Sequence, residues 1–142
     1  IQGVNSSALN ANFGLSVNMV DSTGGTPGSD TFNINGAVTL KGTGALATSN
    51  IDAISIAAAG DIVAATGAVG IAATTISTAG DVTTTSGAIN YTGAVTLSGN
   101  VATTSTLAGA DLTVTGALAL STFNFTASQG LGKATVTGPD VR

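Results

Sequence analysis

The opening segment of the chain, ALNANFGLSVNMV, alternates strictly between apolar and polar positions. From Leu9 to Met19 every odd position is apolar, and every even position between them is small or polar. A period of two is typical of a β-strand with one buried face. At about 3.3 Å per residue, this strand would be roughly twice as long as usual. The pattern therefore predicts one long N-terminal strand within residues 1–20.

Shorter alternating runs separated by glycine fill the rest of the chain. Runs such as AVTL, DVTTTSG and DLTVTGALAL are rich in Val, Ile and Thr, which favour strands. Glycine recurs between these runs, as expected at corners that need positive φ or a close backbone approach. The pattern therefore predicts an all-β protein with many short strands.

The chain also repeats itself. Residues 56–73 match residues 76–93 at an offset of 20, and residues 32–42 match residues 89–99 at an offset of 57, or three times 19. Repeats of this length are typical of solenoids. We expect a parallel β-helix (β-solenoid) of about five coils of 19–20 residues, preceded by the long N-terminal strand. A β-sandwich is the alternative fold.

The coils carry G-x-φ-x-φ and G-D/N-φ-T units, in which the symbol φ stands for an apolar residue and not for the backbone angle. In these units the chain resembles the filamentous-haemagglutinin-type repeats of large bacterial surface and secreted adhesins. The resemblance covers residues 32 to about 120, whereas residues 1–30 do not match. It implies a right-handed parallel β-helix and a role in adhesion or cell-surface architecture. The chain is shorter than is usual for that family.

A connector follows the opening strand. Residues 21–30, DSTGGTPGSD, contain three Gly and one Pro, a composition typical of flexible linkers. We therefore divide the chain into an N-terminal donor or cap strand (1–20), a linker (21–30) and a solenoid domain (31–142). The strand has three uses that remain open. It caps its own solenoid, it continues a longer parent chain, or it adds to the sheet edge of a neighbouring subunit.

Donation to a neighbour has a physical basis. An uncharged alternating strand without Pro aggregates unless it is paired. A head-to-tail contact that does not close on itself produces a filament. The residues expected to insert into the neighbour and form the subunit interface are the apolar set Leu9, Ala11, Phe13, Leu15, Val17 and Met19.

Charge and side-chain chemistry exclude several classes of function. The net charge is −4 with three Lys and Arg, so clustered phosphate contacts to nucleic acid are not expected. The chain has no His, Cys or Glu, which removes the usual nucleophile–base sets, and we expect no enzyme. Asp61 and Asp81 lie one repeat apart, and we expect them to hydrogen-bond backbone at corners. Two carboxylates fall short of a calcium loop, so no metal or cofactor is expected.

Threonine pairs raise the hypothesis of ice binding, because flat ranks of Thr occur on ice-binding solenoids. The four pairs are spaced by 21, 9 and 22 residues, which argues against one rank repeated once per coil. Thr is also a good exposed strand residue. The pairs are Thr83/Thr85, Thr104/Thr106, Thr113/Thr115 and Thr135/Thr137.

Composition also bears on location. A Thr-, Ser-, Asn-, Gly- and Ala-rich chain with few charges favours a secreted, extracellular or cell-surface protein. The chain starts at Ile1, as expected of a mature product or a fragment. Asn5, Asn90 and Asn124 lie in N-x-S/T sequons and are candidate glycosylation sites. The apolar window 54–73 contains an Asp and is followed by a polar copy, so no membrane insertion is expected.

We therefore expect a structural subunit of an extracellular self-assembling filament, joined by insertion of the N-terminal strand into a neighbouring subunit. Its partner is a second copy of itself, together with cell-surface or matrix components. The alternative is a segment of a surface adhesin that binds a cell-surface ligand. An ice-binding solenoid is the third hypothesis.

Overall fold

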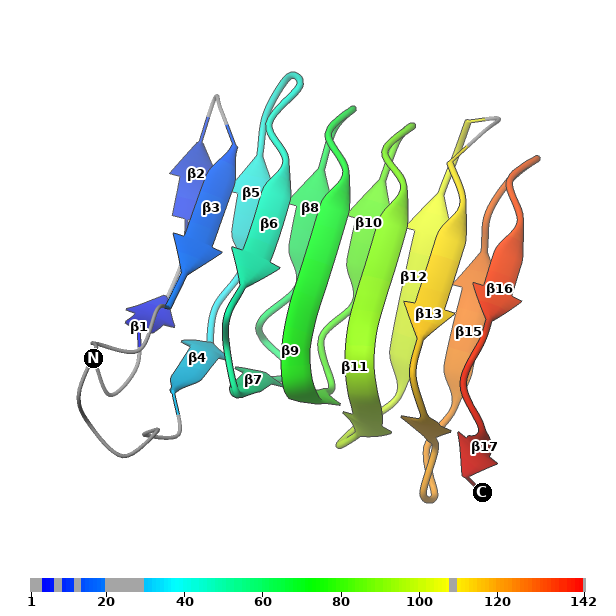
Figure 1. Cartoon of the computed structure of the whole chain (residues 1–142). Coiled ribbons are helices and arrows are strands. Elements are labelled where there is room, and N and C mark those ends of the chain that lie inside the picture. The colour runs from blue at the N-terminus through cyan, green and yellow to red at the C-terminus, as the bar shows by residue number, and fades with distance from the viewer. Residues whose placement is uncertain (1–3, 7–8, 12–13, 20–29, 108–109, 142) are drawn as a thin grey trace.

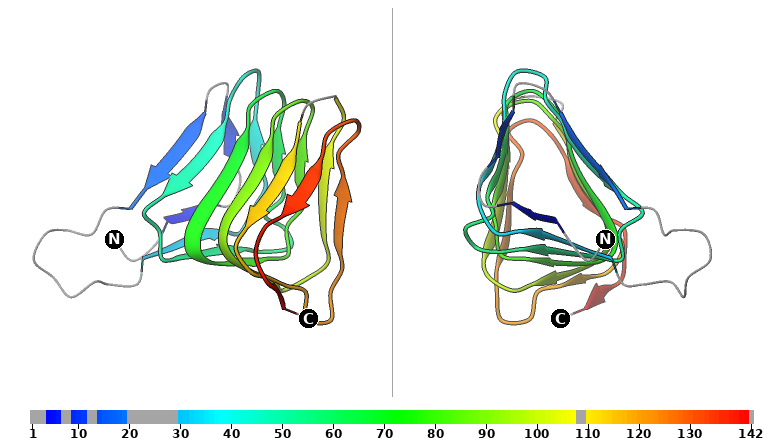
Figure 2. Two further views of the ribbon diagram at one scale, coloured as in Figure 1. Left: turned by 45° about the vertical axis from the view of Figure 1, so that its right-hand side comes forward. Right: turned by 90° about the vertical axis from the view of Figure 1, so that its left-hand side faces the viewer.

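The computed structural model describes residues 4–6, 9–11, 14–19, 30–107 and 110–141, and this part of the chain is all-β without a helix. The chain winds in successive coils, and equivalent strands of neighbouring coils lie side by side (Figure 1). Viewed nearly along the stack, the coils outline a triangle (Figure 2). The predicted β-solenoid of about five coils is confirmed. The β-sandwich alternative is wrong, because every described strand pair is parallel.

Three faces make up the triangle, and each coil contributes a strand to each face. The first face contains β3 (Leu15–Asn18), β6 (Leu46–Ser49), the first halves of β9 (Val69–Thr78) and β11 (Ile89–Leu97), β13 (Leu112–Thr115) and β16 (Ala134–Val136). The second face contains β1 (Val4–Ser6), β4 (Thr31–Ile34), β7 (Ala53–Ile56), the second halves of β9 and β11, β14 (Leu118–Ala119) and β17 (Asp140–Val141). The third face contains β2 (Leu9–Ala11), β5 (Val38–Leu40), β8 (Ile62–Ala64), β10 (Val82–Thr84), β12 (Val101–Ser105) and β15 (Phe125–Ser128).

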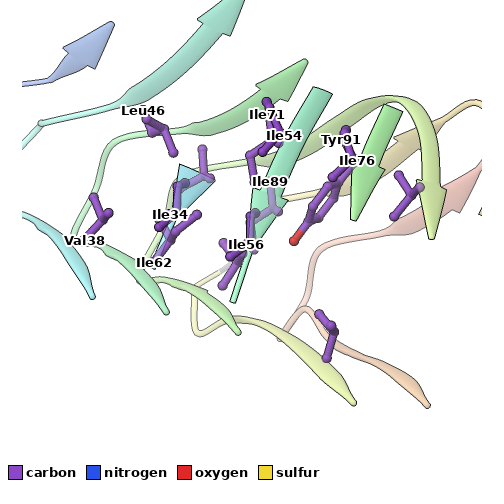
Figure 3. Packing of buried hydrophobic residues seen from close by; sticks show 14 of the residues in the cluster. Ile34, Val38, Leu46, Ile54, Ile56, Ile62, Ile71, Ile76, Ile89 and Tyr91 are labelled. Atoms are coloured by element: carbon purple, nitrogen blue, oxygen red, sulfur yellow. The ribbon is translucent and has the colours of Figure 1, made fainter. Parts of the chain in front are cut away.

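Apolar side chains stack in columns inside the triangle, one residue per coil. Figure 3 shows Ile, Leu and Val side chains of different strands packed in this common interior. Because side chains alternate along a strand, the residues between them face outward. Branched aliphatic residues suit such stacked sheets. One buried column on the second face consists of Phe32, Ile54, Ile76, Val95 and Leu118.

Glycine allows the coils to approach closely at the corners. A Cβ added to Gly87 would clash with the carbonyl oxygen of Gly67 in the preceding coil. Gly116 has a φ of 122°, a conformation that side chains rarely adopt. The predicted role of glycine at corners is therefore confirmed at these positions.

The number of residues per coil varies with the corners. Equivalent residues are 24 apart between Val38 and Ile62, 20 apart between Ile62 and Val82, and 19 apart between Ile76 and Val95. The self-match at an offset of 20 therefore corresponds to one coil where it joins β8 to β10.

The self-match at an offset of 57 does not correspond to a whole number of coils. It equates Val38 with Val95, but Val38 lies in β5 on the third face and Val95 lies in β11 on the second face. Our interpretation of this match as three repeats of 19 residues is wrong. The string AVTL suits any strand that has one buried and one exposed side, and here it occurs in strands on two different faces.

The opening segment also differs from the prediction. Instead of one strand it contains β2, which pairs with β5 on the third face, and β3, which pairs with β6 on the first face. The two strands therefore belong to different faces of one coil. In the sequence, apolar and polar residues continue to alternate from β2 through to β3, so the alternation does not reveal that the two strands lie on different faces. Apart from Asp30, the predicted linker 21–30 lies outside the described residues.

Candidate functional surfaces: corners, threonine ranks and open ends

Acidic residues at one corner connect successive coils. Asp61 and Asp81 lie at the corner between the second and third faces, directly before β8 and β10. The Asp61 Oδ1 accepts a hydrogen bond of 2.9 Å from the Asp81 N–H, and the Asp81 Oδ1 accepts one of 2.7 Å from the Ala102 N–H. The prediction of backbone hydrogen bonding at a corner is confirmed, with the partner in the following coil. In this geometry the carboxylates stabilise the stack.

The same arrangement recurs elsewhere. Asn100 Oδ1 accepts from the Asn124 N–H at 3.0 Å. Asp111, at the corner before β13, accepts from the Lys133 N–H at 2.8 Å. Asp111 therefore lies at a different corner from Asp81. Over the described residues, no group of three or more His, Cys, Asp or Glu side chains lies close enough to hold a metal ion.

The threonine pairs align in two ranks. Thr83 is the register partner of Thr104 on the third face, and Thr113 is the register partner of Thr135 on the first face. The spacings of 21 and 22 residues are each one coil, whereas the spacing of 9 is the step from the third face to the first. The expectation that the pairs do not align is therefore corrected, because two faces each carry a rank. The signal in the sequence was the near equality of 21 and 22 with the coil length.

The rank on the first face spans three coils. Asn90 precedes Thr113 and Thr135 in one outward row, and Thr92 precedes Thr115 in the next row. Successive coils are about 4.8 Å apart, so the row is regular. The third-face rank is less uniform, because Val63 interrupts it and is 41% exposed.

The predicted interface residues pack against their own chain where the structure describes them. Met19 is buried in the core, and the half-buried Leu15 and Val17 pack against it. The backbones of Leu9 and Ala11 pair with Val38 and Leu40 of the next coil. Phe13 lies outside the described residues. A single chain thus shows the capping arrangement, and insertion into a neighbour stays a prediction.

The other end of the stack exposes apolar side chains. Val136 in the last coil is 48% exposed, although Val114, at the same position one coil earlier, is fully buried. Leu131, in the turn before β16, is 86% exposed, but Leu107 at the same corner one coil earlier is also 52% exposed, so apolar side chains are exposed at this corner in both coils. Val136 and Leu131 both lie in runs whose sequence resembles that of the other coils, so the sequence alone does not distinguish them.

One polar side chain is isolated within the core. Tyr91 in β11 is fully buried among the core residues (Figure 3). Its ring packs edge to face against Phe125, with ring centroids 6.4 Å apart. Its hydroxyl has no hydrogen-bond partner among the described residues. Burial, and secondarily the charge of Asp81, raises the pKa of Tyr91 above its ordinary value. The hydroxyl is therefore a neutral group held away from solvent.

The candidate glycosylation sites differ in accessibility. The backbone of Asn5 in β1 pairs with Asn33. Asn90 is half-buried within β11, and Asn124 is exposed at the corner before β15. Of the two whose side chains are described, Asn124 is the more accessible to a modifying enzyme.

A shallow groove lies at the corner between the first and second faces. It runs past Asn50, Ile51, Ala72, Thr74 and Thr92 and contains no charged residue. It forms where β9 has one more residue than β11, so the register of the two strands shifts.

No family model, curated protein or solved structure matches the chain. No helix in the described part of the chain is long and apolar enough to cross a membrane. The likeness to haemagglutinin-type repeats therefore stays a prediction based on the repeat units alone. Function is inferred from the chain's own surfaces and composition.

Proposed function

We propose that the chain is a non-enzymatic structural subunit of an extracellular self-assembling filament. The observation that supports this best is the pair of open ends. At one end β1, β2 and β3 pair only with the coil after them, and at the other β15, β16 and β17 pair only with the coil before them. Such parallel edges are templates for further strands.

Composition supports the extracellular setting and the structural role. Seven Asp, three basic residues and no His, Cys or Glu leave hydrogen bonding and burial as the main chemistry. The partner proposed first is a second copy of the chain, and cell-surface or matrix components are further partners. The chain acts as a secreted building unit.

The pairing of the opening segment bears on how subunits join. Donation of residues 9–19 as one long strand would require breaking the pairing of β2 with β5 and of β3 with β6. Stacking of the described ends leaves the pairing of β2 with β5 and of β3 with β6 in place. End-to-end stacking is therefore the form of assembly that we propose.

Negative-stain electron microscopy of the full chain beside a variant lacking residues 1–22 tests this proposal. We expect filaments from both proteins, because removal of the first coil uncovers β4, β5 and β6 as an equivalent edge. Circular dichroism establishes that the shortened chain is folded. Filaments from the full chain alone would restore the donated-strand joint. Dispersed, folded particles from both would contradict the filament and favour the adhesin, with a ligand bound on an exposed surface such as the corner groove.

The aligned threonine ranks favour ice binding as a second candidate function. A regular row of Thr and Asn side chains on a flat face offers repeated hydroxyl and methyl groups to ordered water. Ice binding predicts thermal hysteresis without polymer formation, and a Thr113→Lys substitution should abolish the hysteresis. Hysteresis that survives this substitution would rule out the first-face rank as the ice-binding surface.

A further inference from the structure

One corner of the solenoid is hollowed on the side of the stack. The groove at the corner between the first and second faces has a volume of about 320 Å³, at the lower end of the range found for small-molecule sites. Three consecutive coils line it, through residues 50–51 between β6 and β7, residues 72–74 in β9 and residues 92–93 in β11. Each of these coils has a described coil on both sides, so the groove belongs to the body of the solenoid.

The backbone fixes the shape of this corner groove. The register of β9 against β11 shifts here, so Ala73 and Thr74 lie opposite Gly93 alone. Gly93 has a φ of 129°, and a Cβ at this position would clash with the carbonyl oxygen of Ala73. On the other side, the Thr74 amide donates to the Ile51 carbonyl at 3.1 Å. The groove is therefore preformed, which reduces the cost of ordering a site when a ligand binds.

The lining of the groove combines apolar and polar groups. Ile51 is buried and the two alanines of the lining are half-buried, whereas the exposed side chains are those of Asn50, Thr74 and Thr92. Small-molecule sites typically have this composition, in which apolar surface provides contact area and a few polar groups fix the orientation of the ligand.

The exposed polar groups of the groove are largely unpaired within the described part of the chain. Asn50 Nδ2 donates to Asn18 Oδ1 at 2.8 Å, which orients the Asn50 amide and leaves its Oδ1 as an acceptor. Neither the Thr74 nor the Thr92 hydroxyl has a hydrogen-bond partner among the described residues, whereas the hydroxyl of the adjacent Thr75 donates to the Asp52 carbonyl at 3.2 Å. The groove therefore offers one acceptor and two hydroxyls that both donate and accept.

Charge narrows the class of ligand. No charged side chain lines the groove, and no Lys or Arg occurs between Lys41 and Lys133. The carboxylate nearest in sequence, Asp52, accepts a hydrogen bond from the Asp30 amide at 3.0 Å. An anionic ligand would therefore lack a cationic partner in the groove, and an amine would lack a carboxylate. A sugar ring without charged groups fits this lining, because it has C–H groups on its faces and hydroxyls around its rim.

We propose that the corner groove binds a sugar unit of a neutral saccharide. The C–H groups of the sugar contact Ile51 and the two alanines, and its hydroxyls bond to Asn50 Oδ1 and to the hydroxyls of Thr74 and Thr92. The groove lies on the side of the stack, so this inference goes beyond the proposed filament and does not require it. In a filament, each subunit would carry such a site, and the repeated sites would bind a polysaccharide more tightly than a single groove does.

Nuclear magnetic resonance of the isotopically labelled, dispersed full-length chain tests this proposal. The neutral probes are maltotriose, mannotriose and triacetylchitotriose, and the anionic control is trigalacturonic acid. We expect at least one neutral trisaccharide to shift the amide signals of residues 72–74 and 92–93 in a saturable way, and the anionic control to leave them unchanged.

Three results would overturn the saccharide site. They are no shift with any neutral probe at millimolar concentrations, shifts confined to other surfaces, and shifts by trigalacturonic acid that equal or exceed those of the neutral probes. None of these results bears on the filament, because the measurement uses the dispersed chain and the filament is tested by electron microscopy.

Two matched substitutions locate the site. Thr92 and Thr96 are both exposed threonines of β11, and of the two only Thr92 lines the groove. Thr92→Ala should raise the dissociation constant of the bound trisaccharide at least about threefold, because one hydrogen bond is lost, and Thr96→Ala should leave it nearly unchanged. Equal effects of the two substitutions would contradict the groove as the binding site.

A competition measurement separates saccharides from the other neutral ligand class. A Gly-Ser-Thr tripeptide capped at both ends is uncharged and offers hydroxyls and amides. We expect this peptide not to displace the trisaccharide. Displacement at a lower concentration than that of the sugar would overturn the saccharide assignment in favour of a neutral peptide.

Discussion

The last described coil of the solenoid and the coil before it have equivalent strands in register, but their surroundings differ. Val114 and Val136 occupy the same position in successive coils, and Val114 is fully buried while Val136 is 48% exposed. Likewise Leu112 is buried and its register partner Ala134 is exposed. A coil of this protein does not bury its own interior residues completely, because the next coil completes their burial. The last described coil lacks that cover, so its inward positions Ala134 and Val136 are exposed.

The largest difference between the two coils should appear on truncation of inward side chains. Ile89→Ala removes a fully buried side chain from β11 and should lower the free energy of unfolding by about 3 kcal/mol. Val136→Ala should lower it by less than about 1 kcal/mol. Urea denaturation of the dispersed protein measures both values. Equal losses would contradict the description of the last coil as uncovered.

The buried hydroxyl of Tyr91 should make the middle coils sensitive to alkali. The ordinary pKa of tyrosine is 10.0, and burial raises the pKa of Tyr91 in the folded state. Its contribution to stability is complete below pH 10 and falls by about 1.4 kcal/mol per pH unit as the pH rises above that value, because only the unfolded chain then loses the proton. Urea midpoints measured between pH 9 and 11.5 show this slope.

Tyr91→Phe is the control for that slope, since the chain has no other tyrosine. The variant should lose the alkaline slope and gain about 1 kcal/mol at pH 7, because the unpaired hydroxyl no longer has to be buried. An unchanged slope would show that a different group controls the alkaline transition.

Truncation of a polar corner side chain should lower the stability of the protein only where a further coil donates a hydrogen bond to that side chain. Asp81→Ala removes the acceptor for the Ala102 amide and should cost about 1 kcal/mol, while Asp81→Asn keeps an acceptor and should cost less. Asn124→Ala should change the stability of the dispersed chain by less than about 0.5 kcal/mol, since no described coil lies beyond it. Thermal unfolding of the three variants tests this ranking, and a large loss in Asn124→Ala would contradict it.

Local features of the sequence were sufficient to predict the fold class. Short runs of Val, Ile and Thr separated by glycine predicted the strands and corners, and the self-match at an offset of 20 predicted stacked coils. The roles of Asp61 and Asp81 were also predicted, because a polar side chain at a corner has few partners other than backbone amides. These predictions held because they depend on residues close together in the chain or exactly one coil apart.

The sequence by itself thus determined that this protein is a β-solenoid with acidic residues at its corners. Only the tertiary structure decided that residues 9–19 contain two strands on different faces, that the threonine pairs form two ranks, and that Val136 is exposed whereas Val114 is buried. The physical reason is the same in each case. Between β2 and β3 apolar and polar residues alternate in the sequence without a break, although the two strands lie on different faces, and a residue's burial depends on a coil that lies about twenty residues away in the sequence.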